Sequence, residues 1–336
     1  MRSPIAFILR RTESALAAVI VLLAVIFSLS SPYFLTASNA ADLIEAYSVT
    51  TILAAGVFVV LVSGGIDISF AAVASVTQYA AALVATRYGV PAVPAIGLAC
   101  AMGFVLGSVN ALLTYYLRVA SIIVTIATGS LFYATLIYFT GGSEIYNLPD
   151  WWTERVVFFR MESASGDIAR ITLPMVIMVV VVIVTHLLMT RSHAGRQIYA
   201  LGGNPEAASR VGIKILRIQI LVYGYLGFLA GLAGFVQAHR VHQVVPTAMF
   251  GTELSVLAVA ILGGASLVGG VGSMGGVVVG VLLLAILQNG LNLLGVSSYF
   301  FGVVIGLTIL ISISVTGYTE QRMRQRHRAE VSGWMT

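Results

Sequence analysis

Long apolar runs separated by short polar segments extend along the whole chain. A helix needs about 20 mostly apolar residues to cross a bilayer. Ten apolar runs, several interrupted by glycine, lie at about residues 14–29, 48–64, 69–86, 91–117, 121–140, 171–190, 218–238, 253–264, 275–295 and 297–317. The pattern predicts an all-α integral membrane protein with ten transmembrane helices, give or take one. The run at 253–264 is too short to span unless it continues into the glycine-rich residues after it or lies in a broken helix.

The composition agrees with this pattern and excludes an ordinary soluble protein. Of 336 residues, 59% are apolar and 9% are charged, whereas soluble domains are about 45–50% apolar and about 25% charged. We therefore expect one membrane domain over residues 1–318, embedded in a lipid bilayer, and a basic tail over 319–336. The net charge of +5 would suit nucleic acid, but the basic residues flank the apolar runs. They indicate membrane topology, and no nucleic-acid partner is expected.

The distribution of Lys and Arg predicts which loops face the cytoplasm. With ten spans and the amino terminus inside, the cytoplasmic side holds three arginines before the first span, Arg118, five basic residues in the 191–217 loop and four in the tail. These are 13 of the 18 basic residues, and basic residues are enriched in cytoplasmic loops. Both termini and the 191–217 loop are therefore predicted to be cytoplasmic. The segment 141–170 is predicted to be external, with Trp151 and Trp152 in an aromatic belt at the outer interface.

The sequence lacks the common catalytic motifs. A P-loop ends in Gly-Lys-Ser/Thr, but the only lysine, Lys214, is flanked by isoleucines, and neither HExxH nor GxSxG occurs. Cys100 is the only cysteine. Only His239 and His242 lie within one turn of each other, and we expect this pair to be solvated rather than metal-bound. We therefore expect no enzyme activity and no metal or cofactor in this chain.

A break between two apolar runs, residues 62–69, contains the most informative polar residues of the membrane region. Gly64 and Gly65 can end one helix in a left-handed turn, and Asp67 or Ser69 can begin the next helix by accepting backbone N–H bonds. The segment therefore predicts a broken helix or a very tight connection. A carboxylate at membrane depth is costly and often functional. Asp67 is either a helix cap or a contact for substrate, gating or a coupling ion.

A second interrupted region covers residues 261–276 and includes Gly263 and Gly264. Two glycine-interrupted segments in corresponding halves of a chain indicate a transporter pathway. The polar residues that follow, Gln288, Asn289 and Asn292, need partners inside lipid. They either form hydrogen bonds between helices, the reading we prefer, or line a translocation path. The candidates for path or gating are Gly64, Gly65, Asp67, Ser69, Asn110, Gly263, Gly264, Gln288, Asn289 and Asn292.

The most basic loop predicts a short helix outside the bilayer. Asn204 is a good N-cap, Pro205 suits the first helical position, Glu206 complements the positive helix end, and Gly212 can end the helix. A helix of about two turns is marginal alone in water, so it must pack on something. That surface is either its own membrane domain or a cytoplasmic partner subunit.

Four motifs in order resemble the membrane permease subunits of bacterial ABC sugar importers of the ribose, xylose and galactose type. Residues 63–69 resemble the SGGIDLS element of that family, and residues 195–212 resemble its GRxIYAxGGNxxAAxxxGI loop. Residues 261–276 resemble its IGGTSLxGGxGSxxGT segment, and residues 289–296 resemble its NGLxLLGV run. The resemblance covers nearly the whole chain.

This resemblance implies a ten-span, type II-like permease in the bacterial inner membrane. It implies three partners: a cytoplasmic ATPase that binds ATP and Mg, a second permease copy in a homodimer or heterodimer, and an extracytoplasmic sugar-binding protein. The short loop helix would then couple the permease to the ATPase. The coupling residues would be Gly203, Asn204, Pro205, Glu206, Ala207, Ala208, Arg210, Val211 and Gly212.

The sequence departs from the family pattern at a few positions. Ser255 stands where an acidic residue is frequent, Val277 where Thr is frequent, and Tyr299 to Phe301 where an aromatic–Gln pair is common. These differences bear on the substrate more than on the family. The alternatives are an ion-coupled secondary transporter that uses Asp67 or Glu253, and a channel or membrane scaffold. The secondary transporter gives the basic loop helix no function, and a channel or scaffold does not explain the broken segments.

Overall fold

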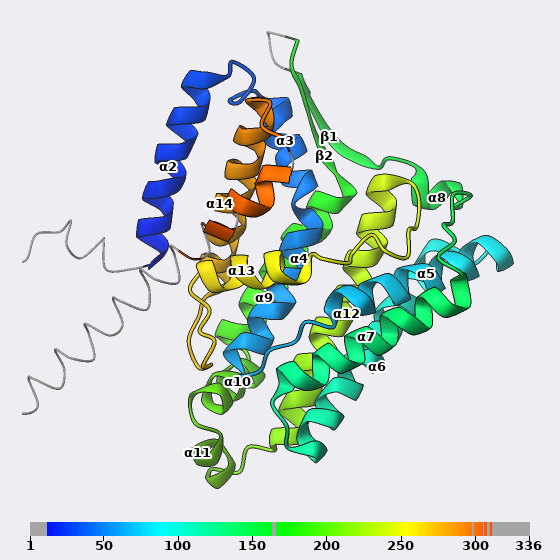
Figure 1. Cartoon of the computed structure of the whole chain (residues 1–336), viewed down its shortest axis with the longest axis vertical. Helices are drawn as coiled ribbons and strands as arrows, with labels where there is room; N and C mark the ends of the chain where they lie inside the picture. The colour runs from blue at the N-terminus through cyan, green and yellow to red at the C-terminus, as the bar shows by residue number, and fades with distance from the viewer. Residues whose placement is uncertain (1–11, 163–165, 298, 305, 308–309, 311–336) are drawn as a thin grey trace, which may run out of the picture.

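The apolar runs form helices in the computed structural model of the chain, which describes residues 12–162, 166–297, 299–304, 306–307 and 310 (Figure 1). About half of the expected last span, 297–317, and the whole of the tail, 319–336, lie outside the described residues. The elements in chain order are α2 (Thr12–Ser30), α3 (Ala37–Ala46), α4 (Ser48–Val62), α5 (Phe70–Tyr88), α6 (Ala92–Leu117), α7 (Ser121–Thr140), α8 (Asp150–Thr153), β1 (Val157–Glu162), β2 (Ile168–Thr172), α9 (Leu173–Arg191), α10 (His193–Gly203), α11 (Pro205–Arg210), α12 (Ile215–Val241), α13 (Glu253–Leu262) and α14 (Met274–Leu293).

Five helices in the described part of the chain are long and apolar enough to cross a membrane, namely α6, α7, α9, α12 and α14. The pair α3 and α4 qualifies as one span with a 46° bend, which brings the number to six. The ten residues of α13 cover only about 15 Å, roughly half of a hydrocarbon core. A mostly helical membrane protein is therefore confirmed, while ten spans and cytoplasmic termini stay predictions.

The centre of the molecule is α4, a helix that is apolar on every side. All of its residues except Thr50 are buried, and Ile52, Phe58 and Leu61 are among the largest fully buried side chains. A helix that is hydrophobic all round belongs in a core rather than at a surface. The run at 48–64 thus forms a central helix whose carboxyl end enters the first break.

Small residues bring α6 and α12 close together. A Cβ atom added to Gly103 of α6 would lie 2.0 Å from the carbonyl oxygen of Gly227 of α12. A Cβ atom on Gly107 would lie 2.1 Å from the carbonyl oxygen of Tyr223. Backbones approach this closely only where side chains are absent, which is how many membrane helices associate.

The all-α prediction is wrong for part of the segment 141–170. There β1 and β2 form an antiparallel hairpin with Gly166 at a φ of 79° between the strands. The strands are rich in aromatic and β-branched residues, which favour extended backbone, and the run is too short and too charged for a span. The hairpin lies at the end of the molecule opposite to α11 (Figure 1).

A carboxylate beside the hairpin joins it to α3. Asp167 Oδ2 accepts a hydrogen bond of 3.1 Å from the backbone N–H of Ser38, in the first turn of α3. Hydrogen bonds from the side chain and backbone of Ser38 lower the pKa of Asp167. The carboxylate therefore stays ionised next to the positive end of the helix.

Two expectations for this end of the molecule are wrong. Trp152 is fully buried, and its Nε1 donates a hydrogen bond of 3.2 Å to the carbonyl oxygen of Phe235. The Nδ1 atom of His239 lies 2.6 Å from the carbonyl oxygen of Trp152, and His239 is 4% exposed. Trp152 therefore packs into the core instead of an interfacial belt, and His239 is not solvated. The reason is that α8 places Trp152 against Phe235 of α12, and 83 residues separate these two positions in the sequence.

Candidate functional site

The loop helix predicted after Asn204 is present as α11. The Oδ1 atom of Asn204 accepts a hydrogen bond of 3.0 Å from the N–H of Ala207, as an N-cap does. Pro205 occupies the first turn with Glu206, Arg210 lies in the last turn, and Gly212 follows with a φ of 85°. Each local signal in the sequence therefore acts as expected.

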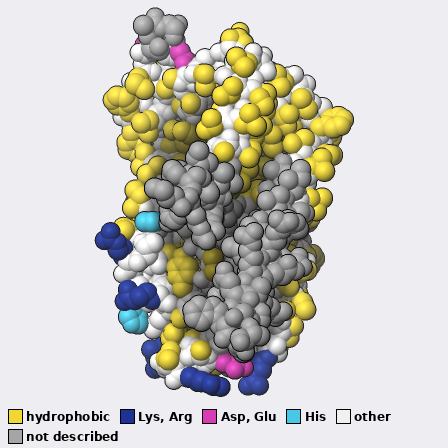
Figure 2. Space-filling view, turned by 90° about the vertical axis from the view of Figure 1, so that its left-hand side faces the viewer, with side chains coloured by type: hydrophobic (Ala, Val, Ile, Leu, Met, Phe, Trp, Pro, Cys, Tyr) yellow, Lys and Arg dark blue, Asp and Glu magenta, His cyan; other side chains and the backbone are white. Residues whose placement is uncertain are grey.

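Almost the whole surface of this short helix is exposed. Of residues 203–212, Ala208 alone is buried, and Val211 is 77% exposed. In Figure 1, α11 forms the end of the molecule, and Figure 2 shows Lys and Arg side chains gathered at that end. Glu206 and Arg210 therefore present both signs of charge, beside an apolar residue, on a protruding element.

The sequence analysis missed the longer helix that carries α11. Helix α10 begins after Ser192, whose hydroxyl accepts a hydrogen bond of 2.9 Å from the N–H of Gly195. Its residues Ile198 and Leu201 are buried. The signal was present in the sequence as an N-capping serine before a spaced pair of apolar residues. Because α10 is anchored in this way, α11 projects from a fixed support.

Five glycines join the end of α10 to both broken segments, and we call this set, Gly64, Gly202, Gly203, Gly269 and Gly270, the glycine junction. A Cβ atom on Gly202 would lie 1.9 Å from the carbonyl oxygen of Val62, and one on Gly269 would lie 2.7 Å from the Cα atom of Gly64. The N–H of Gly270 donates a hydrogen bond of 2.8 Å to the carbonyl oxygen of Val62. The junction therefore brings three chain segments into backbone contact.

The two breaks have the same local geometry. Gly64 has a φ of 86° and donates its N–H to the carbonyl of Leu61, while Gly264 has a φ of 89° and donates its N–H to the carbonyl of Ile261. The next residue in each break, Gly65 or Ala265, donates to the carbonyl five residues before it. Both helices thus end in the left-handed turn that glycine favours.

Gly263, the first glycine of the second break, packs against the following helix. A Cβ atom on Gly263 would lie 2.4 Å from the carbonyl oxygen of Gly276 in α14. This contact fixes the end of α13 against α14, while Gly264 has no atom close to its Cβ position.

Asp67 is the centre of a buried polar cluster. It is 2% exposed, and its Oδ1 accepts hydrogen bonds of 2.7 Å from both the N–H and the hydroxyl of Ser69. The Nδ2 of Asn110, in α6, lies 2.7 Å from the hydroxyl of Ser69 and 3.4 Å from Asp67 Oδ2. Of the two expected caps, Asp67 accepts the N–H of Ser69, the residue just before α5, while Ser69 itself makes no side-chain capping bond. Asn110 is an additional partner from a distant helix.

The amides of α14 take part in contacts between helices. Tyr47 donates a hydrogen bond to Oε1 of Gln288. Asn39 and Asn289 bond reciprocally through their amides, at 3.1 and 2.9 Å. Asn292 is exposed. Gln288 and Asn289 therefore join α14 to α3 and to the start of α4, which supports the preferred reading of these residues.

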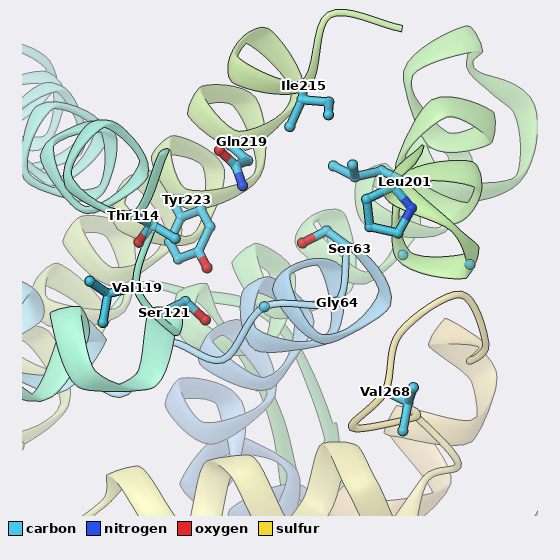
Figure 3. Close-up of a pocket in the computed structure, with 14 residues that line it drawn as sticks. Ser63, Gly64, Thr114, Val119, Ser121, Leu201, Ile215, Gln219, Tyr223 and Val268 are labelled. Carbon is cyan, nitrogen blue, oxygen red and sulfur yellow. The ribbon is translucent and has the colours of Figure 1, made fainter. Parts of the chain in front are cut away.

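Gly263, Gly264 and Asn292 apart, the candidate residues thus lie in three separate groups. The Asp67 cluster lies between α5 and α6, the α14 amides face α3 and α4, and the glycine junction lies beside α10. Next to the junction is a cavity of about 420 Å³ (Figure 3). Its side chains from α6, α7 and α12 were missed, because no local motif marks them.

Comparison with known proteins decides the family. The chain matches the family described as "Branched-chain amino acid transport system / permease component" over residues 39–313. The chain belongs to this permease family. No solved structure matches this permease significantly.

Curated relatives of this permease cover nearly its whole length. It is 35% identical to the ribose import permease protein RbsC of Escherichia coli (strain K12) over 303 residues, 90% of this chain and 92% of the relative. It is 37% identical to the ribose import permease protein RbsC of Bacillus subtilis (strain 168) over 294 residues, 87% of this chain and 88% of the relative. It is 30% identical to the D-allose transport system permease protein AlsC of Escherichia coli (strain K12), over 88% of each chain. The resemblance seen in the four motifs is confirmed.

Proposed function

We propose that this chain is the membrane-spanning permease subunit of an ATP-binding-cassette importer that carries a monosaccharide or a related small polar solute. The family consists of transport permeases rather than enzymes, and the curated relatives are named for ribose, allose and galactose. The apolar helices support a multi-pass protein of the bacterial cytoplasmic membrane. The solute would arrive from an extracytoplasmic sugar-binding protein.

The observation that carries this proposal is the exposed helix α11 on its anchored support. Residues 203–212 present Glu206, Arg210 and Val211 to solvent, while α10 connects them to the glycine junction. An ATPase subunit that binds ATP and Mg would dock on this surface. The loop 191–217 would then be cytoplasmic and the hairpin segment 141–170 external, in agreement with their positions at opposite ends of the molecule (Figure 1).

The contacts suggest how movement would pass from the ATPase to the membrane region. Closure of the ATPases on ATP would displace α11 and, through α10, the glycine junction. Because the junction contacts both breaks, the ends of α4 and α13 would move with it. A second permease copy would move in the opposite sense, so that a path between the two copies opens alternately to the outside and the inside.

The test replaces both charges of the exposed helix. The double variant Glu206→Ala and Arg210→Ala removes side chains from the surface of α11 and leaves the Asn204 cap intact. We expect the variant to reach the membrane, to lose most of the co-purifying ATPase and to lose most ATP-dependent uptake. The readouts are ATPase recovered with the tagged permease and radiolabelled sugar uptake, each normalised to permease in the membrane.

A matched control carries the same two changes at the opposite end, Arg160→Ala and Glu162→Ala in β1, where both residues are exposed. The control should retain the ATPase. Normal uptake and normal ATPase recovery in the α11 variant would contradict the docking proposal.

The ion-coupled alternative makes a different prediction. The Asp67 carboxylate is already engaged by Ser69 and Asn110, so its position is explained without a coupling ion. Glu253, the other candidate, lies in the first turn of α13 and is half-buried. Sugar accumulation by the purified chain alone in vesicles with a proton or sodium gradient would favour the alternative. Uptake that requires ATP and the ATPase subunit would exclude it.

A further inference from the structure

Helix α13 covers only one half of the depth of the membrane. A Cβ atom on Gly263, just after its last residue, would lie 2.4 Å from the carbonyl oxygen of Gly276, and one on Gly280 would lie 2.3 Å from the carbonyl oxygen of Val259. The last turns of α13 therefore pack against the first turns of α14, a helix long enough to span. Since its ten residues cover about 15 Å of a core about 30 Å thick, α13 begins near the middle of the bilayer.

The chain crosses the other half without a helix. Residues 242–252, between α12 and α13, form turns and one isolated antiparallel bridge, in which Val244 pairs with Ile145. Helix α13 then begins without a side-chain cap from Thr252. In its first turn, the N–H groups of residues 253–255 donate no hydrogen bond to any other described residue. Backbone groups at this depth therefore need partners from outside the described part of the chain.

These residues also form an open surface, which we call the α13 face: Thr247, Phe250, Gly251, Glu253 and Leu254. Phe250 is 68% exposed and Leu254 is 72% exposed. Thr247 and Gly251 are exposed as well, and Glu253 is half-buried. Helix α13 packs on α4 and α14 (Figure 1), which leaves this face uncovered. The face therefore combines apolar side chains, polar groups and irregular backbone.

A lipid bilayer does not suit the α13 face. Lipid tails offer no hydrogen bonds, so non-helical backbone at membrane depth lies against protein or a water-filled space. A carboxylate at this depth, such as that of Glu253, likewise faces water or the interior of a helix bundle. Val105 shows the contrast, because it is 59% exposed on α6, a regular helix whose backbone groups bond to one another. The position of Val105 suits lipid.

We propose that a second copy of this chain covers the α13 face and encloses a water-filled space with it. In a twofold contact the same surface of each copy meets its equivalent, so both irregular segments leave the lipid together. Phe250 and Leu254 supply apolar contacts, while Glu253 faces the water between the copies. The second copy rests on the proposed function, whereas the choice of this face follows from the length of α13 and from its backbone. The path between the copies therefore passes α13 rather than the Asp67 cluster.

The test places a nitroxide spin label at Leu254, at Glu253 or at Val105. Each residue is replaced by cysteine in a Cys100→Ala chain, and the purified full-length protein is reconstituted into nanodiscs that hold two copies. Val105 is the matched control in the middle of α6. Helix α6 packs mainly on α5, α7 and α12, whereas α13 packs mainly on α4 and α14, so the two labels lie on different sides of the molecule.

Three readouts identify what surrounds each label. Collisions with oxygen report lipid, collisions with a water-soluble nickel chelate report water, and dipolar coupling reports that equivalent positions of two copies lie close together. We expect the label at Leu254 to collide with oxygen several-fold less than the label at Val105, and to show strong coupling. The label at Glu253 should collide with the chelate several-fold more than the label at Val105.

The opposite results overturn the proposal. A label at Leu254 that meets oxygen as often as the label at Val105 would mean that lipid covers the α13 face. Few oxygen collisions without dipolar coupling would mean that another segment of the chain or a different protein covers it. A label at Glu253 that the chelate does not reach would exclude the water-filled space. Thr247→Cys serves for the oxygen and coupling measurements if Leu254→Cys does not reach the membrane.

The measurement separates this proposal from the proposed function. It uses purified protein without sugar, ATP or an ATPase, so strong coupling at Leu254 supports the interface whatever drives transport. Sugar accumulation by the chain alone on a proton gradient counts against the proposed importer, and it leaves the result at the α13 face unchanged.

Discussion

The carboxylate of Asp67 illustrates, at the scale of one residue, how far local sequence information reaches. The sequence predicted that Asp67 or Ser69 accepts backbone N–H bonds at the start of the next helix, and Asp67 does accept the N–H of Ser69, at 2.7 Å, together with the hydroxyl of Ser69. Its relation to Asn110 was not foreseeable, because 43 residues separate the two side chains. The cluster thus combines a local cap with a contact to α6, and it fixes the start of α5 against that helix.

Removing this carboxylate should lower the stability of the protein. In Asp67→Ala the N–H of Ser69 and the amide of Asn110 lose an acceptor in a buried position, which costs about 1–3 kcal/mol. Asp67→Asn keeps one acceptor oxygen and should cost less. The thermal midpoint of the purified protein, measured by fluorescence in detergent, should therefore be highest for the wild type, lower for Asp67→Asn and lowest for Asp67→Ala. Asp42→Ala, an exposed position on α3, serves as the control, and an unchanged midpoint for Asp67→Ala would refute the structural role.

Helices α6 and α12 show what decides packing between elements. Both were predicted from their apolar runs, and both form helices long enough to span a bilayer. The runs contain several glycines, and the sequence does not show which of them face another helix. Gly103 faces Gly227 so closely that their backbones are in contact, whereas Gly97 on the same helix has no atom within 4 Å of its Cβ position. The same residue type therefore has a packing role at one position and none at the other.

This difference predicts opposite outcomes for one substitution. Gly103→Ala places a methyl group 2.0 Å from the carbonyl oxygen of Gly227, so α6 and α12 must separate along their closest contact. We expect a clearly lower thermal midpoint and more aggregate in size-exclusion chromatography. Gly97→Ala should be neutral or slightly stabilising, since alanine favours a helix by roughly 1 kcal/mol over glycine. Similar profiles for both variants would show that the contact does not limit stability.

At the scale of the whole molecule, the glycine junction connects parts that lie far apart in the sequence. It joins residues of the first break, the end of α10 and the second break, at positions 64, 202–203 and 269–270. The junction lies where the end of α4, the end of α10 and the segment between α13 and α14 meet. A displacement of α11 therefore has a direct route, through backbone contacts, to the ends of α4 and α13.

Two neighbouring glycines of the junction allow a sharp test. Gly202→Ala introduces a Cβ atom 1.9 Å from the carbonyl oxygen of Val62, while the Cβ position of Gly203 is open. Gly202→Ala should loosen the junction, and hydrogen exchange should rise in α10 and in residues 263–272, where Gly270 loses its bond to Val62. Gly203→Ala should exchange as the wild type does. Unchanged exchange in Gly202→Ala would mean that the junction does not hold these segments together.

Much of the architecture was accessible from the sequence because its causes are local. Apolar runs predicted the helices, since a chain in lipid must satisfy its backbone hydrogen bonds within each segment. The capped helix α11 was predicted from Asn204, Pro205 and Gly212, whose effects extend over a few residues only. Four ordered motifs indicated the permease family, which the comparisons confirm.

Other features were decided by the tertiary structure alone. The burial of Trp152 of α8 against His239 and Phe235 of α12, the meeting of five glycines from three segments, and the cavity lined by Thr114, Gln219 and Tyr223 all depend on residues that fold together from distant positions. Hydrophobic periodicity specifies which residues leave water, but in a chain that is apolar almost throughout it does not specify which face meets which partner. Steric fit between backbones decides which helix faces pack together. This fit arises only when the helices are packed.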